Sequence, residues 1–228
     1  FYTGNAFRKS YNKNKVVIRQ LGLEIFSSRN ENKDDKEIID TSITILKKAG
    51  IKNAKVKIGN FKLFELLIQK LSIPERWKKR LIKFYWNSKY FSELLKRLES
   101  NLDIDPFIVA GDHKTYLKMK KENPNKIVAG RSYREILDRY EKKINDPRIT
   151  KTGKQSCKII KEFLKIKCPL KSAPEKLNKF YKKYNLNISV GKEFFPITNF
   201  KQNNLNFEFS TSNGRGTEIE YYSSFIFS

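Results

Sequence analysis

Three side chains near the start of the chain could bind a small ligand that carries hydrogen-bond donors. Arg8 offers a cation, Gln20 an amide and Glu24 a carboxylate. Gln20 and Glu24 are four residues apart, so on one β-strand they would share a face and point at the same ligand. An amide oxygen and a carboxylate accept hydrogen bonds from ammonium and ring N–H groups. An amino acid whose side chain is a basic ring would suit such a pair of groups.

A second set of candidate side chains lies near the end of the chain, at Arg215, Tyr221 and Tyr222. Arg215 could neutralise the carboxylate of such a ligand, and Tyr222 could place a hydroxyl group beside its ring. The alternative is purely structural: Glu24 pairs with a nearby Lys, and the tyrosines pack in a sheet.

The first ligand residues lie in a predicted β-hairpin. Residues 1–8 and 16–27 are apolar and strand-like, and the polar segment between them contains the Asn and Ser residues of a turn. A helix is expected next, with Asp34 and Glu37 as a start that resembles a capping box and with Gly50 at its end.

The following elements are predicted from periodicity and from capping residues. Alternating polar and apolar residues at 54–59 predict a strand. Asn60 is expected to cap a second helix, and Pro74 to occupy the first position of a third. A fourth helix is expected at about residues 90–98.

The second half of the chain changes from helix back to strand. Residues 112–186 have a mainly helical and very basic pattern, with breaks expected at Pro124, Pro147, Gly153 and Pro169. Strands are expected at 188–190, 205–209 and 218–227. We therefore predict an α+β fold with one mainly antiparallel sheet built from residues 1–27, 54–59 and 205–227, because strands and helices do not alternate regularly. Both ends of the chain are strand-like, so we expect an incomplete fragment.

The composition bears on the class of partner. A net charge of +24 would suit a nucleic acid, but only 11 of the 48 basic residues are Arg, and the Lys residues are spread along the chain. A surface built for nucleic acid is more often rich in Arg that is clustered with aromatic residues. We therefore expect a solvated basic surface and do not expect nucleic acid as a partner.

Two cysteines, Cys157 and Cys168, match neither a zinc signature nor a disulfide framework, which predicts a reduced, cytoplasmic protein. No apolar run is long enough to cross a bilayer, and no glycine-rich phosphate loop is present. We expect no metal, no cofactor and no membrane contact.

Two segments far apart in the chain resemble signature motifs of the histidyl-tRNA synthetases and their relatives. Residues 4–8 (GNAFR) followed by residues 19–24 (RQLGLE) resemble class II motif 2, in which a strand ends in Phe-Arg and a return strand carries Q-x-G-x-E. Residues 214–216 and 220–227 resemble the histidine-specific R-G-L-D-Y-Y-T segment and the strand after it.

This resemblance implies a class II synthetase-like domain over residues 1–228, truncated at both ends, with residues 112–186 as a helical insertion within it. The residues that it implies for histidine binding are Gln20, Glu24, Arg215, Tyr221 and Tyr222. Arg8 is implied as a vestigial phosphate-binding residue.

The residues after Arg8 differ from the synthetase pattern, and this difference distinguishes an enzyme that charges tRNA from a regulatory relative. Histidyl-tRNA synthetases follow the motif 2 Arg with an acidic residue and a long loop rich in Arg, Pro and Gln, whereas a basic residue and a short loop follow Arg8. An adenylation site needs donors held within fractions of an ångström around the α-phosphate. The chain, including residues 128–136, is more similar to the regulatory subunit of ATP phosphoribosyltransferase, a non-charging paralogue.

The resemblance to that paralogue implies a regulatory subunit with no catalytic residues of its own, needed for the first step of histidine biosynthesis. It implies three partners: a short-form catalytic subunit, further copies of the chain through the class II-like domain, and histidine as an effector. Two alternatives stay open. One is a fragment of a genuine histidyl-tRNA synthetase, and the other is a nucleic-acid-binding module that uses its basic surface.

Overall fold

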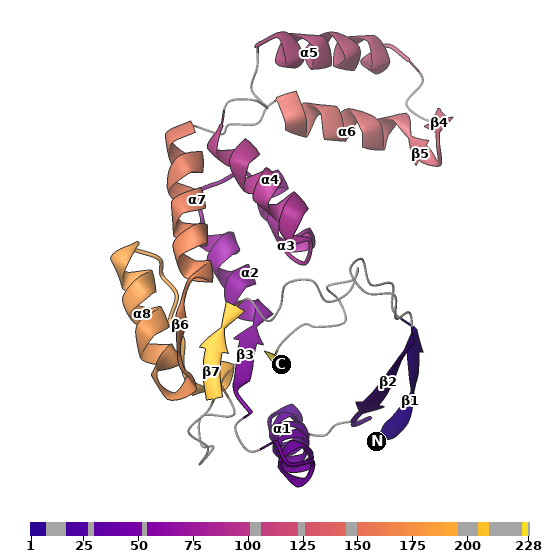
Figure 1. Cartoon of the computed structure of the whole chain (residues 1–228). Coiled ribbons are helices and arrows are strands. Elements are labelled where there is room, and N and C mark those ends of the chain that lie inside the picture. The colour runs from indigo at the N-terminus through magenta and orange to yellow at the C-terminus, as the bar shows by residue number, and fades with distance from the viewer. Residues whose placement is uncertain are drawn as a thin grey trace.

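The protein combines a small mixed sheet with eight α-helices among the residues that the structure describes (Figure 1). This computed structural model describes residues 1–7, 17–26, 30–51, 54–100, 106–122, 126–144, 150–195, 205–209 and 225–227. Helices and strands are both present and follow one another without strict alternation, so the predicted α+β class is confirmed.

The main sheet has four strands in the order β6-β7-β3-β8. These strands are β6 (Lys167–Pro169), β7 (Leu205–Glu208), β3 (Val56–Asn60) and β8 (Phe225–Phe227). Strand β3 runs parallel to β7 and antiparallel to β8, and β6 runs antiparallel to β7. The sheet therefore joins segments that are distant in the sequence, since Ile58 pairs with Phe227.

The predicted single sheet is wrong in one respect. Strands β1 (Tyr2–Phe7) and β2 (Val17–Gly22) form the predicted hairpin, but they make a two-stranded sheet of their own. Within the main sheet, two of the three pairings are antiparallel, as predicted, and the pairing of β3 with β7 is parallel. Hydrophobic patterning within each strand identifies a strand but does not specify its partner, so the separation of the hairpin from the main sheet was not visible locally.

Helices cover the main sheet and supply most of the core. They are α1 (Glu31–Lys48), α2 (Phe61–Lys70), α3 (Glu75–Lys83), α4 (Ser88–Glu99), α7 (Thr150–Leu164) and α8 (Ala173–Lys183). Their buried apolar side chains join those of β3 and β7 in one cluster. Two close pairs of aromatic rings belong to this cluster. Phe64 stacks on Tyr85 with 4.2 Å between the ring centroids, and the ring centroids of Phe163 and Phe209 are 4.3 Å apart.

The helix ends show which capping signals decide a boundary. Asn60 caps α2 as predicted, because its side chain accepts a hydrogen bond from the Lys62 N–H at 2.9 Å. Gly50 has φ +86° just after the end of α1, the left-handed conformation expected of a helix-ending glycine. The predicted start at Asp34 is wrong: Asn30 caps α1, accepting from the Lys33 N–H at 3.2 Å.

Other predicted boundaries are close to the observed ones or differ for a visible reason. Pro74 is the residue before α3 and not its first residue. Gly153 is buried inside α7 and does not interrupt it. The strand expected at 188–190 is irregular, because Val190 donates its N–H to the Asn178 side chain at 2.8 Å and accepts from it at 2.9 Å.

Helices α5 (Pro106–Lys120) and α6 (Tyr133–Ile144) pack side by side, away from the sheet (Figure 1). Strands β4 (Ile127–Val128) and β5 (Arg131–Ser132) form a short antiparallel hairpin before α6. Ala129 and Gly130 both have positive φ there, at 50° and 76°, as a two-residue hairpin turn requires. Ser132 and Glu135 then cap α6 reciprocally.

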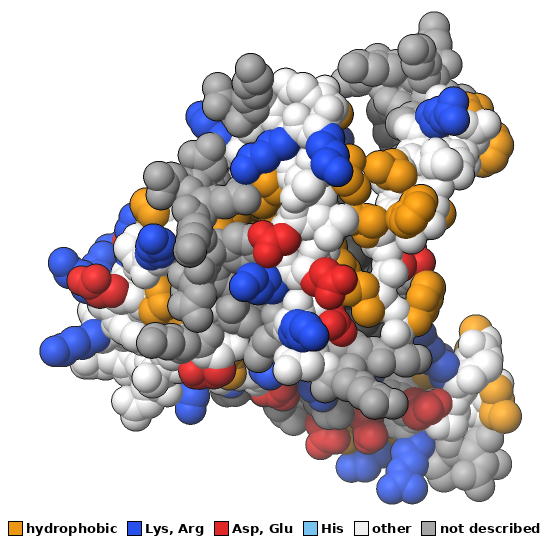
Figure 2. Space-filling view, turned by 90° about the horizontal axis from the view of Figure 1, so that it is seen from below, with side chains coloured by type: hydrophobic (Ala, Val, Ile, Leu, Met, Phe, Trp, Pro, Cys, Tyr) orange, Lys and Arg blue, Asp and Glu red, His pale blue; other side chains and the backbone are white. Residues whose placement is uncertain are grey.

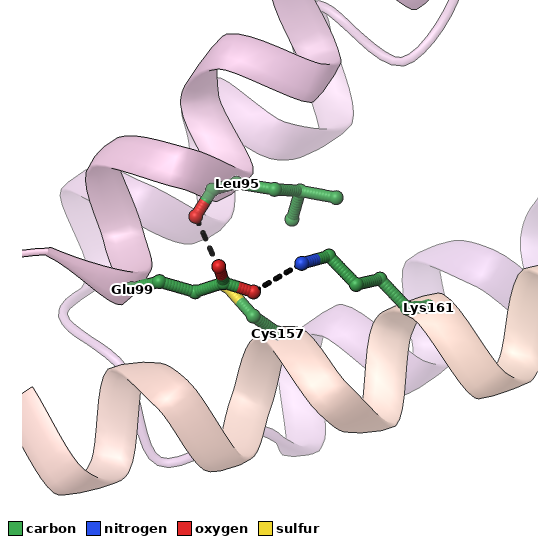
Figure 3. Close-up of polar contacts among 4 residues, drawn as sticks. All are labelled: Leu95, Glu99, Cys157 and Lys161. Carbon is green, nitrogen blue, oxygen red and sulfur yellow. Dashed lines mark hydrogen bonds and ion pairs between the residues drawn. The ribbon is translucent and has the colours of Figure 1, made fainter.

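Helix α7 follows α6 in the chain and packs against α4. The buried Cys157 Sγ donates to the Leu95 carbonyl at 3.3 Å, and Lys161 forms an ion pair with Glu99 one turn further along both helices (Figure 3). Cys157 and Cys168 are both buried thiols, and burial raises the pKa of the Cys168 thiol. Strand β6 belongs to the main sheet, while the division of residues 112–186 into a separate insertion stays a prediction.

Candidate ligand-binding hairpin

The register of the β1–β2 hairpin decides which residues share a face. Tyr2 pairs with Gly22, and Gly4 pairs with Gln20. Directly opposed residues in an antiparallel pair lie on the same face, and residues two apart on one strand do so as well. Tyr2, Gly4, Gln20 and Gly22 therefore line one face of the hairpin.

Gln20 is half-buried and has a defined partner on this face. Its Nε2 atom donates a hydrogen bond to the Tyr2 hydroxyl oxygen at 3.0 Å. The Tyr2 ring lies over Gly22, where a Cβ atom would be 2.3–2.5 Å from three of its atoms. Tyr2 was not predicted as a site residue. The signal that could have identified it is its place in the first predicted strand, opposite the glycine of the Q-x-G-x-E segment.

Glu24 lies two residues beyond the end of β2 and is exposed. The prediction that Gln20 and Glu24 are on one strand is therefore wrong, because the ladder of hydrogen bonds ends at Gly22. The two side chains remain near each other in the chain, with Glu24 at the edge of the hairpin.

The remaining predicted site residues are Arg8, Arg215, Tyr221 and Tyr222, and all of them lie outside the described residues. Their convergence with Gln20 and Glu24 on one cavity stays a prediction. The described part of the site is an amide, a phenol and a carboxylate, which suits the binding of N–H donors.

Other surfaces of the described chain contain none of the predicted site residues. A shallow groove at the end of α8 is lined by Asn178, Lys182 and residues 185–189. Among the described residues, no group of three or more His, Cys, Asp or Glu side chains is placed to hold a metal ion. A search of the same residues finds no helix with the length and apolar character of a membrane span.

The basic side chains are dispersed on the face seen in Figure 2. Lys and Arg lie there among Asp, Glu and apolar side chains and do not form one continuous basic area. On the described part of this face, the arrangement agrees with the predicted solvated basic surface.

Comparisons with known proteins show what the chain is similar to. The histidyl-tRNA synthetase family model matches residues 1–142. The ATP phosphoribosyltransferase regulatory subunit of Rhizobium rhizogenes is 26% identical over 242 residues, covering 99% of this chain and 64% of the relative. The protein of that name from Allorhizobium ampelinum is 24% identical, with the same coverage.

A third regulatory subunit, from Clostridium acetobutylicum, is 36% identical over 107 residues, which cover 45% of this chain and 25% of the relative. No solved structure matches the chain. The chain spans 64% of the length of the first two relatives. A family model that covers residues 1–142, together with the motif 2 hairpin observed within them, places the chain in the histidyl-tRNA synthetase family.

Proposed function

We propose that the chain is part of a regulatory subunit of ATP phosphoribosyltransferase and acts in the first step of histidine biosynthesis, in the cytoplasm. The observation that carries the proposal is the similarity, over 99% of this chain, to proteins of that name from two organisms. The subunit performs no catalytic step itself. It assembles with a short-form catalytic subunit and with further copies of itself through the class II-like domain.

The sequence after Arg8 supports a non-charging role. Adenylation of histidine needs side chains that contact ATP from the motif 2 loop, positioned within fractions of an ångström. A basic residue and a short polar loop follow Arg8, without the acidic residue and the Arg- and Pro-rich loop of the charging enzymes. Arg8 is then a remnant of a phosphate-binding site.

Histidine is the proposed effector. Gln20 and Glu24 accept hydrogen bonds from its ammonium and imidazole N–H groups, Arg215 pairs with its carboxylate, and Tyr222 supplies a hydroxyl group beside its ring. Tyr221 belongs to the same histidine-binding set by resemblance. A ligand shifts the activity of a complex only if it binds one arrangement more tightly than another. Histidine must therefore favour one arrangement of the two kinds of subunit.

Glu24→Gln tests this site, because the substitution keeps the size of the side chain and removes its charge. A hydrogen bond to a charged group contributes about 1.5–3 kcal/mol. The histidine concentration that half-inhibits transferase activity in the reconstituted complex should therefore rise about tenfold or more. Assembly with the catalytic subunit should be unchanged, as measured by size-exclusion chromatography. An unchanged inhibition curve would show that this hairpin is not the sensor.

A genuine histidyl-tRNA synthetase is the second candidate, since the family model that matches residues 1–142 carries that description. Histidine-dependent ATP–pyrophosphate exchange by the full-length protein separates the two functions. We expect no exchange above background. Exchange at the rate of an ordinary synthetase would establish charging and remove the regulatory proposal.

A further inference from the structure

We propose that the tip of the α5–α6 arm docks into an apolar pocket on the catalytic subunit, with carboxylates around the rim of that pocket. The arm tip consists of the end of α5 and the β4–β5 hairpin, residues 117–122 and 126–132, which lie at the same end of the arm (Figure 1). The inference rests on the proposed function, because it takes the catalytic subunit as the partner.

The arm tip exposes three aliphatic side chains. Ile127 is 72% exposed, Leu117 46% and Val128 41%. Single exposed apolar side chains are ordinary on a protein surface, but a group of them marks a surface that another molecule covers. The tip is the end of the arm at which α5 stops and α6 begins, and it points away from the core (Figure 1). It is therefore accessible to a partner.

Local contacts hold the exposed hairpin in one conformation. The Tyr133 N–H donates to the Lys126 carbonyl at 2.8 Å. The Lys126 Nζ atom lies 3.2 Å from Glu122 Oε2 and 5.0 Å from the centroid of the Tyr133 ring, which is buried. Ser132 and Glu135 cap the helix that follows. A partner that binds a preformed surface of this kind loses less conformational entropy on association.

The turn between β4 and β5 has a conformation that is unusual for its sequence. Ala129 has φ +50°, in the left-handed region, where a residue with a Cβ atom is strained. Asn, Asp or Gly is the common residue at such a position of a two-residue turn. Backbone strain persists only where the surrounding structure holds it, and it is concentrated at binding and catalytic sites. The turn therefore supports a binding role for Ile127 and Val128.

Positive charge surrounds the aliphatic side chains and indicates what the partner surface contains. The arm tip has five basic residues and one acidic residue, a net charge of +4: Lys118, Lys120, Lys121, Lys126, Arg131 and Glu122. The Glu122 carboxylate is already paired with Lys126. A complementary surface therefore has a small apolar pocket with carboxylates around it.

The chemistry of the tip favours a protein partner over a nucleic acid. Single strands are bound by basic side chains together with aromatic rings that stack on the bases. The well-exposed apolar side chains of the tip are aliphatic, and the Tyr133 ring next to them is buried. An apolar centre with a charged rim is the usual arrangement of a protein–protein interface.

Ile127→Asn tests the apolar centre of the tip. The Kd of the full-length protein for the catalytic subunit should rise about tenfold or more, as for a central apolar contact of an interface. Ile51→Asn is the matched control, since Ile51 is 49% exposed and follows α1, outside the arm. This control should leave the Kd unchanged. Calorimetry measures the Kd, and thermal unfolding checks that both variants stay folded.

Lys121→Glu tests the charged rim, and Lys179→Glu on α8 is its control with the same change in net charge. Lys121→Glu should raise the Kd about threefold to tenfold at low salt, and the difference should shrink as salt screens the charges. Lys179→Glu should leave the Kd unchanged at each salt concentration. Equal effects of the two substitutions would show that only the total charge matters, which would overturn the proposed rim.

The outcomes separate the inference from the function beneath it. If the wild-type protein binds the catalytic subunit and Ile127→Asn binds it equally well, docking through the tip is overturned while the regulatory function stands. If the wild-type protein does not bind the catalytic subunit, the proposed function fails together with the inference.

Other occupants of the tip are tested with the same variant. The full-length protein is mixed with phosphatidylserine vesicles and with a single-stranded oligonucleotide, and its oligomeric state is measured alone. We expect Ile127→Asn to change none of these three results. Binding to vesicles or to the oligonucleotide that Ile127→Asn abolishes, or a changed oligomeric state, would assign the tip to a membrane, a nucleic acid or a second copy and overturn the inference.

Discussion

Tyr181 and Tyr85 bury their hydroxyl groups in the same core with opposite consequences. Tyr85 donates its hydroxyl to the Phe209 carbonyl at 3.2 Å. The Tyr181 hydroxyl is buried with no hydrogen-bond partner among the described residues, and burial raises its pKa well above the ordinary value. A buried polar group without a partner loses its hydration without compensation.

Replacing each tyrosine by Phe should therefore change stability in opposite directions. Tyr181→Phe removes an unpaired hydroxyl and should raise the free energy of unfolding by about 1 kcal/mol. Tyr85→Phe removes the hydrogen bond from the Tyr85 hydroxyl to the Phe209 carbonyl and should lower the free energy of unfolding by about 1 kcal/mol. Urea denaturation of the full-length variants measures both. A loss of stability in Tyr181→Phe as large as that in Tyr85→Phe would contradict the account.

At the residue scale, the position of Gln20 was predicted better from the sequence than the positions of Glu24 and Tyr2. Its position on β2 followed from the two strand-like runs on either side of a polar turn, and the structure confirms this hairpin. Glu24 was placed on the same strand because spacing does not show where a strand ends. Tyr2 was missed because its contact with Gln20 joins two strands, and only the register reveals it.

At the scale of elements, local sequence signals predicted an element correctly where nearby residues supply the hydrogen bonds of its backbone. The alternation at 54–59 corresponds to β3, and the caps at Asn60 and Gly50 are as predicted. Strand β6 has only three residues, too few for a period of two to stand out in a basic helical region. The irregular backbone at Val190 depends on a side chain twelve residues away, which local patterning cannot show.

Asn60 connects three elements and gives a prediction at this scale. It is 2% exposed, its Oδ1 caps α2, and its Nδ2 donates to the Phe194 carbonyl at 3.2 Å. Asn60→Ala removes a cap and leaves a carbonyl unpaired, which should cost about 2 kcal/mol or more. Asn30→Ala removes the exposed cap of α1 and should cost about 0.5–1 kcal/mol. Thermal unfolding compares them, and equal costs would show that the contact with Phe194 contributes nothing.

At the scale of the whole molecule, the apolar core and the candidate site are in different places. The core lies between the main sheet and its helices, while Gln20 lies on a separate hairpin. Several apolar side chains of that hairpin are exposed, including Phe7 at 76% and Leu21 at 52%. Such a hairpin gains little stability by itself, because two strands alone are marginal in water.

The family could be predicted from the sequence because each of its two motifs is a short, contiguous segment. The function was harder to predict, because a fold can host both charging and regulation and the difference lies in a few side chains. Arg215, Tyr221 and Tyr222 remain predictions from resemblance, since they fall outside the described residues.

The transferase activity of the catalytic subunit, measured with and without the full-length protein, tests the regulatory function most directly. Both proteins come from the same organism, and activity is followed as the full-length protein is titrated to saturation. We expect activity to depend on the added protein and to saturate at a fixed ratio of the two subunits. Full activity of the catalytic subunit alone, unchanged by the addition, would contradict the regulatory role.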